Sequence, residues 1–127
     1  MDDVLRNQIR RYIEMAEEDL QAAGFLIGKG FYRAAINRSY YACFQMINGA
    51  LLSQDIDPER TRKKEILSAF KTIFTFDSQM IEPEYCRAYE RIEQLKQSGD
   101  RVNGDPPTRE EADWAHREAQ RFVERLK

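Results

Sequence analysis

The sequence is poor in the residues that build metal and cofactor sites. Among its 127 residues there is one histidine, His116, and there are two cysteines, Cys43 and Cys86. A structural zinc site needs about four such ligands, so we expect no metal. Because there is also no glycine-rich phosphate loop, we expect no cofactor. Two cysteines without an export signal predict free thiols in a reducing cytoplasm.

Long apolar runs and an excess of one charge are also missing. No apolar run approaches the roughly 18–20 residues that span a bilayer, so we expect no membrane contact. The 20 basic residues are balanced by 22 acidic ones, for a net charge of -2. This balance excludes the global basic field of a dedicated nucleic-acid binder, although local basic patches are still possible. With 42% hydrophobic residues, we expect a single domain over residues 1–127.

Glycine and proline are scarce, and they separate segments whose apolar residues recur at helical spacing. The spacing predicts helices over about 4–27, 31–53, 63–75, 83–99 and 108–126. Proline follows Glu82 at the expected start of one helix, and Thr108 with Glu111 forms a capping box at another. No stretch alternates with a period of two. We therefore expect an all-α, up-and-down antiparallel bundle of four long helices and one short one.

The segment 31–53 is apolar on nearly all sides, which predicts a central helix buried by several neighbours. Arg38 and Gln45 share one strip of this helix, and Tyr41 lies between them. We predict a ligand-binding pocket in which Arg38 takes a phosphate or carboxylate, with Lys96 and Asp100 closing it. The alternative is that Arg38 forms an internal ion pair, with Asp100 as the candidate partner. Both interpretations need Arg38 to be enclosed.

Three further features each allow two interpretations. The basic stretch 60–64 is a solvated loop or a phosphate-contacting patch at the rim of a groove. Trp114 lies opposite the apolar stripe of its helix, as an incidental residue or an interface anchor. Arg109 and His116 project from one side of a helix, about 10 Å apart along its axis. They are the alternative catalytic pair, or else His116 only flanks the core.

The pattern of residues 30–45, GFYRAAINRSYYACFQ, resembles the second-helix motif of the HEPN domain family. Later stretches are similar, in the same order, to the family's third, fourth and last helices. They are 63–70, 96–101 and 110–123. The resemblance therefore covers nearly the whole chain.

The resemblance implies a helical bundle that forms a homodimer. Many members of the family are metal-independent ribonucleases whose site lies between the two copies. Others are inactive modules that bind RNA, nucleotides or partner proteins. Small prokaryotic members are often paired with a minimal nucleotidyltransferase as toxin and antitoxin, so such a protein is a candidate partner.

This sequence departs from the family pattern where catalysis would be expected. Gln45 stands where a histidine often ends the second-helix motif, and Lys96 replaces an arginine at the end of the fourth helix. Metal-free RNA cleavage needs a group that moves a proton and a cation for the phosphate. We therefore expect a binding module without its own catalysis. One alternative is a ribonuclease toxin that uses Arg109 and His116 or an atypical site around Arg38. Another is a purely structural subunit that assembles through the Trp114 face.

Overall fold

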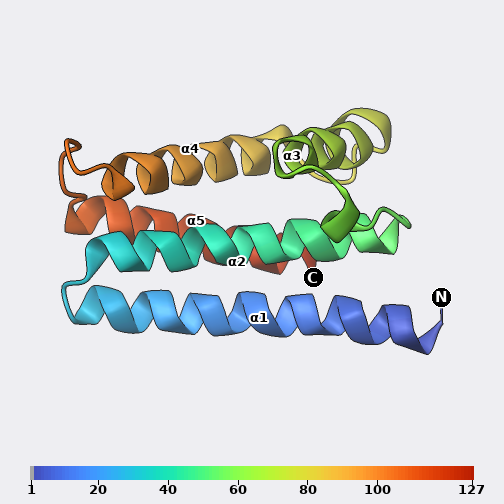
Figure 1. Ribbon diagram of the computed structural model, residues 1–127, viewed down its shortest axis with the longest axis horizontal. Coiled ribbons are helices and arrows are strands. Elements are labelled where there is room, and N and C mark those ends of the chain that lie inside the picture. The colour runs from blue at the N-terminus through green and yellow to red at the C-terminus, as the bar shows by residue number, and fades with distance from the viewer. Residues whose placement is uncertain (1) are drawn as a thin grey trace.

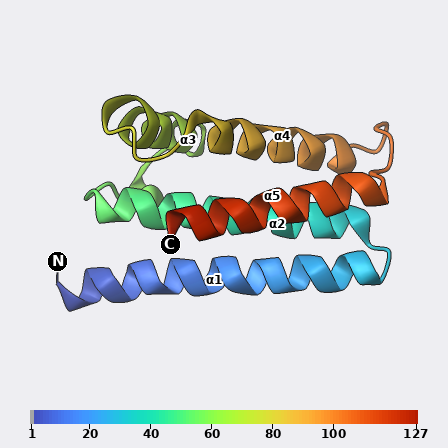
Figure 2. The same ribbon diagram turned by 180° about the vertical axis from the view of Figure 1, so that it is seen from behind.

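The structure, a computed structural model, describes residues 2–127, and within that range it contains helices and no strand. Figures 1 and 2 show a bundle in which α1 and α4 run in one direction and α2 and α5 in the other. The predicted all-α fold is confirmed. The elements are α1 (Asp3–Gly28), α2 (Tyr32–Ser53), the short 3-10 turn η1 (Pro58–Arg60), α3 (Lys63–Lys71), the π-helical turn η2 (Thr72–Asp77), α4 (Pro83–Asp100) and α5 (Arg109–Leu126).

The helix ends follow local chemistry that the sequence displays. The Asp2 carboxylate accepts a hydrogen bond from the Leu5 N–H at 2.7 Å and caps α1. Thr108 and Glu111 exchange the two hydrogen bonds of the predicted capping box. Gly30 has a φ of +81°, which only glycine adopts at little cost, and it lets α2 turn back along α1.

The third helix differs from its prediction. The apolar spacing predicts one helix from Lys63 to Thr75, but the α-helix ends at Lys71 and a π-helical turn follows. The Thr75 hydroxyl donates to the Lys71 carbonyl, four residues earlier. A side chain on this acceptor competes with the regular backbone ladder, which is a reason for the wider turn.

The α2 helix lies at the centre, packed against α1, α4 and α5, with α3 over its C-terminal half (Figure 1). Small residues allow the closest approach: Ala16 and Ala23 of α1 and Ala35 and Ala42 of α2 are fully buried. The larger core side chains interlock around them. They include Ile36, Ile47, Leu51, Phe70, Tyr89, Ile92, Phe122 and Val123.

Both cysteines are free and buried. Burial raises the pKa of the Cys43 thiol and also that of Cys86. The thiols therefore stay protonated and act as small apolar core residues. Among residues 2–127 there is no helix with both the length and the hydropathy to cross a bilayer.

Candidate functional site

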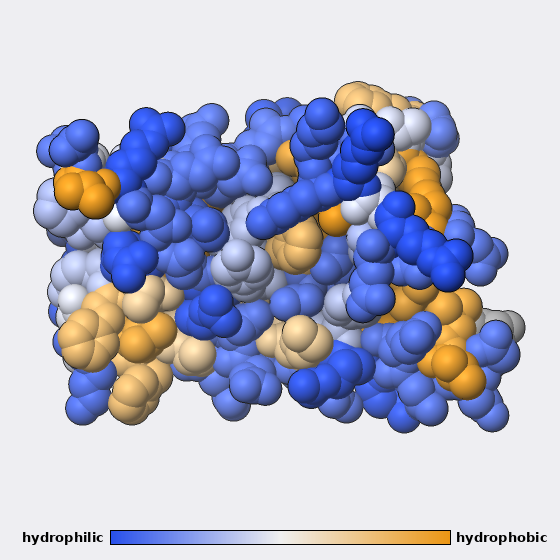
Figure 3. Space-filling view, viewed as in Figure 1, coloured by the Kyte–Doolittle hydropathy of each residue, from blue (hydrophilic) through white to orange (hydrophobic). Residues whose placement is uncertain are grey.

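One side of α2 is not covered by another helix. It lies between α1 and α4, on the face turned toward the viewer in Figure 1. Arg38, Tyr41 and Gln45 are half-buried there, while most of the helix is buried. The central helix and the shared strip are thus as predicted. Figure 3 shows this face: its middle is largely hydrophilic, and hydrophobic side chains gather toward the two ends.

Arg38 is not the enclosed, lone guanidinium that the sequence suggested. Its Nη1 donates to Oδ1 of Asp19 on α1 at 3.1 Å, and its side chain is 41% exposed. The guanidinium also lies 5.0 Å from the centre of the Tyr41 ring. An ion pair therefore forms, but Asp100 as its partner is wrong. Arg38 faces the neighbouring α1, whereas Asp100 contacts Arg33 and Asn37 of α2.

Asp100 has its own set of partners. Its carboxylate accepts hydrogen bonds from Arg33 at 2.9 Å, from Asn37 at 3.2 Å and from Lys96 at 3.1 Å. Burial acts to raise the pKa of Asp100, but the hydrogen bonds from Asn37, Lys96 and Arg33 outweigh it and hold the pKa below its usual value. Asp100 thus joins the end of α4 to the first turns of α2.

Asp19 shows the opposite balance. Its side chain is only 13% exposed. Burial raises its pKa above the ordinary value, and the positive charge and hydrogen bond of Arg38 offset that effect only in part. The Arg38 guanidinium is therefore already engaged in compensating a poorly hydrated carboxylate.

Cations lie over aromatic rings along this face of α2. Lys96 Nζ is 5.5 Å from the ring centre of Tyr40 and 5.8 Å from that of Tyr41. Lys63 Nζ is 5.9 Å from the ring centre of Phe44. With Arg38 on Tyr41, side chains of three helices form one cluster, in which Tyr40 is buried and Tyr41 and Phe44 are partly exposed. We call it the cation–aromatic row, and its members are Arg38, Tyr40, Tyr41, Phe44, Lys63 and Lys96.

A hollow of about 460 Å³ adjoins the row between α2, α3 and α4. Tyr40, Phe44 and Tyr89 supply aromatic walls, and Lys63 and Lys64 lie among the lining residues. The Tyr89 hydroxyl donates to that of Tyr40 at 3.1 Å. Burial raises the pKa of both tyrosines, so both stay neutral. The basic stretch 60–64 thus contributes to a groove, as one of its two interpretations requires.

Sequence reasoning missed part of this surface. Tyr40 and Phe44 belong to the apolar pattern of the central helix, so the sequence did not indicate that lysines would lie over their rings. Lys63 comes from another helix, and only the fold places it on Phe44. The sequence Tyr40-Tyr41-x-x-Phe44 could have indicated this surface. Its helical spacing places three aromatic rings close together within two turns. Gln45 lies one turn beyond Tyr41, as predicted.

The alternative catalytic residues are engaged elsewhere. His116 Nε2 lies 3.0 Å from the Leu20 carbonyl oxygen, which can only accept, so Nε2 carries the proton. The ring lies against Gly24, where a Cβ atom would be 3.4 Å from Cε1. Arg109 pairs with Asp113 at 3.7 Å, within α5. The two side chains do not meet, and their catalytic role stays a prediction.

Trp114 is half-buried, not exposed as the helical pattern suggested. It lines a hollow between α4 and α5 together with Tyr85 and Arg121. The indole therefore packs at the edge of the core, and its role as an interface anchor is a prediction that the fold does not decide.

Residues 9–127 match the HEPN domain. This chain belongs to the HEPN domain family. A candidate toxin of Methanocaldococcus jannaschii is 34% identical over 123 residues, which are 97% of this chain and 89% of that protein. A second candidate toxin of the same organism is 33% identical over 55 residues, 43% of this chain and 37% of that protein. The HEPN resemblance drawn from the second helix is thereby confirmed.

A solved structure shows the same arrangement of helices. The crystal structure of a Thermus thermophilus protein superimposes with a TM-score of 0.76 and covers 94% of this chain and 96% of the other. At 20% sequence identity the likeness shows the shared fold.

Proposed function

We propose that this HEPN protein is a recognition module that binds a phosphate-bearing ligand of the nucleotide or RNA type and forms a homodimer, without catalysis of its own. The observation that carries the proposal is the cation–aromatic row. Single-stranded nucleic acids bind surfaces on which positive charges follow the phosphates and aromatic rings stack on the bases. The row combines cations with the partly exposed rings of Tyr41 and Phe44, on a chain whose net charge is slightly negative.

The lysines of α3 are the best placed to take a phosphate. None of the ion pairs among residues 2–127 involves Lys63 or Lys64. Both lie in the first turn of α3, where the backbone N–H groups also favour an anion. Arg38 and Lys96 already hold carboxylates, so they contribute charge and ring contacts at the other end of the row.

Catalysis is not part of this proposal because the row, with Gln45 and Tyr89 beside it, offers no group that exchanges a proton near neutral pH. Gln45 has no titrating group, and burial keeps Tyr40 and Tyr89 neutral. Lysine and arginine in the row hold phosphate as cations and are poor bases. The surface therefore suits binding better than cleavage.

A binding titration tests the proposal. The probe is a fluorescein-labelled oligouridylate of about ten nucleotides, followed by anisotropy at several salt concentrations. We expect the double variant Lys63→Ser/Lys64→Ser to bind at least about tenfold more weakly, with a shallower salt dependence. Arg87→Ser, on the far side of α4, is the matched control. Equal affinities of the two variants, or no binding at millimolar protein, would remove the row as the site.

The dimer has a separate test. Light scattering at micromolar concentration is expected to give about twice the chain mass of 15.0 kDa. A mass of one chain at all concentrations would contradict the dimer and leave the binding result standing. Co-purification with a minimal nucleotidyltransferase from a shared operon would identify the partner that the family resemblance suggests.

A candidate toxin of Methanocaldococcus jannaschii is among the relatives that this chain matches over most of its length, and its name favours a second candidate function. The family resemblance implies that such a toxin would be a metal-independent ribonuclease. Here Arg109 would hold the phosphate and His116 would move the proton. Incubation of the protein with mixed RNA in EDTA, beside a His116→Ala variant, separates the two functions. Cleavage that the variant loses supports the enzyme, and no cleavage at high protein concentration supports the recognition module.

A further inference from the structure

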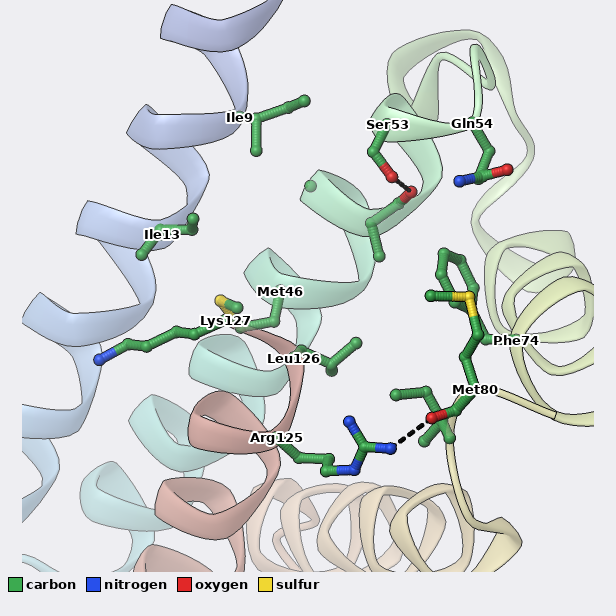
Figure 4. Close-up of a pocket in the computed structure, with 13 residues that line it drawn as sticks. Ile9, Ile13, Met46, Ser53, Gln54, Phe74, Met80, Arg125, Leu126 and Lys127 are labelled. Carbon is green, nitrogen blue, oxygen red and sulfur yellow. Dashed lines mark hydrogen bonds between the residues drawn. The ribbon is translucent and has the colours of Figure 1, made fainter. Parts of the chain in front are cut away.

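Two hollows of the molecule differ in the charged groups that they offer to a ligand. One is an apolar groove beyond the last turn of α5, where Figure 4 shows Ile9 and Ile13 of α1 across from Phe74. Its charged lining side chains, Arg125 and Lys127, are already paired with carboxylates. This groove therefore has no unpaired charge among residues 2–127 with which to select a ligand. The hollow beside the cation–aromatic row does have one.

That hollow, of about 460 Å³ between α2, α3 and α4, has walls of different character. Phe44 of α2 and Leu67 of α3 contribute partly exposed apolar surface, and the lysines 63–64 stand at the start of α3. The α4 side is polar, with Glu93 and Gln97. The volume lies in the range of roughly 300–1,000 Å³ that is usual for small-molecule sites. Apolar surface beside a polar wall suits a flat ring with a hydrogen-bonding edge.

Glu93 is a half-buried carboxylate without a cation. No ion pair among residues 2–127 involves it, although Lys63 and Lys64 line the same hollow. Its Oε2 accepts a hydrogen bond from the Tyr40 hydroxyl at 3.4 Å, and Tyr40 accepts one from Tyr89 at 3.1 Å. No other hydrogen bond to this carboxylate is present among those residues. Oε1 is therefore left to accept from a ligand, and a poorly hydrated carboxylate gains most from added donors.

Gln97 extends the polar wall. It lies one turn along α4 from Glu93, about 6 Å at the helical rise, and on the same side of the helix. A carboxylate only accepts hydrogen bonds, whereas an amide also donates them. A ligand edge that meets both groups must present donors to Glu93 and can place an acceptor beside them on Gln97.

Among the nucleic-acid bases, guanine has this edge. Its N1–H and N2 amino groups are adjacent donors, and the O6 acceptor follows them. Adenine and cytosine each carry an amino group next to a ring nitrogen without a proton, and uracil carries one N–H between two carbonyls. Those acceptors would face the Glu93 carboxylate without a proton to share, which is unfavourable in a partly buried site.

We propose that this hollow selects guanine, with the N1–H and N2 amino groups on the Glu93 carboxylate and O6 on the Gln97 amide. The ring lies against Phe44 and Leu67, and the phosphate extends toward the first turn of α3. The inference rests on the recognition function proposed above and gives it a specificity, in which Glu93 is the residue that distinguishes one base from another. A free guanine nucleotide and a guanosine within RNA offer the same edge.

Three labelled oligonucleotides test the inference with the natural chain. They are the oligouridylate of about ten nucleotides and two relatives in which its central uridine is replaced by guanosine or by adenosine. The guanosine oligonucleotide is expected to bind at least about tenfold more tightly than the adenosine one, the discrimination that a good bidentate pair gives. Inosine, which lacks only the N2 amino group of guanosine, should lose most of this gain. This comparison changes the ligand alone, so no folding defect can produce it.

Two variants of α4 assign the preference to its residue. Glu93→Gln keeps the side-chain size and removes the carboxylate, so the ratio of guanosine to adenosine affinity should fall to about threefold or less. Glu84→Gln removes a carboxylate from the same helix outside the hollow, and it should keep the full ratio. Equal ratios in the two variants overturn the guanine site, as does equal affinity of the natural chain for the two oligonucleotides.

The Lys63→Ser/Lys64→Ser variant separates this inference from the recognition function. If it weakens binding of all the oligonucleotides while none is preferred, the recognition function stands and the guanine site is wrong. If none of them binds at millimolar protein, both are wrong.

Competition with GMP and AMP distinguishes the two sources of guanine. Displacement of the guanosine oligonucleotide by GMP and not by AMP would assign the hollow to a free nucleotide. A guanosine preference that neither mononucleotide disturbs would assign it to RNA, and both results support the guanine site. Equal displacement by the two mononucleotides would contradict it.

Discussion

The two sides of α2 show how one helix serves two purposes. On the inner side, Ala35, Ala42 and Ile47 are fully buried against neighbouring helices. On the open side, Arg38 and Tyr41 are half-buried and cations lie over the rings. Apolar side chains gain free energy when they leave water, so the inner side supplies stability. The open side keeps charges that a closed interior would penalise, and the proposed ligand site lies on it.

The largest expected effect distinguishes the two sides by stability. Ile47→Ala removes fully buried methyl groups and should lower the free energy of unfolding by about 2–5 kcal/mol. Gln45→Ala, two residues away on the open side, should change it by no more than about 0.5 kcal/mol. Urea denaturation with a common m-value measures both. Equal losses for the two variants would mean that the open side is also part of the core.

A smaller effect concerns the ion pair between Arg38 and Asp19. Arg38→Gln should cost about 1 kcal/mol, because it leaves a carboxylate with a 13% exposed side chain without its cation. Asp19→Asn should cost less, since it also removes the buried charge. A double-mutant cycle from denaturation curves should give a coupling of about 0.5 kcal/mol or more. If the effects of the two substitutions on stability were strictly additive, the ion pair would contribute nothing to the open face.

The smallest expected effect is on how the stability of the fold depends on pH. The contributions of Asp100 and Asp19 to that dependence should have opposite signs. The folded state lowers the pKa of Asp100, so its stabilisation is present above its unfolded pKa and is lost as pH falls through the folded pKa. The folded state raises the pKa of Asp19, so it binds a proton more readily than the unfolded chain, and stability falls as pH rises past 3.8.

The two asparagine variants check this. The stability difference between the natural chain and Asp100→Asn should shrink as the pH is lowered below the usual aspartate range. The corresponding difference for Asp19→Asn should move in favour of the natural chain over the same change. Thermal unfolding from pH 3 to pH 6 is the measurement, and matching trends would show that the two carboxylates share one environment.

The fold was largely predictable from the sequence. The helix boundaries follow from apolar spacing, Pro83, Gly30 and the Thr108 capping box, all of which act over a few residues. The π-helical turn after Lys71 was not predictable, because it depends on where the Thr75 hydroxyl finds its acceptor. The site was predicted only in part: Lys96 lies beside both Tyr41 and Asp100, as predicted, but Asp100 binds Arg33 and Asn37 and not Arg38.

From the sequence alone follow the all-α class, the central place of α2, the HEPN resemblance and the absence of a histidine at position 45, because each is written in local spacing and residue type. Only the tertiary structure decided that Arg38 pairs with Asp19, that Lys63 lies on Phe44 and that a groove lies beyond α5. These contacts join residues of different helices, and their partners are chosen by how the helices rotate and slide as the core packs. The spacing of residues within one helix does not indicate how that helix is rotated against its neighbours.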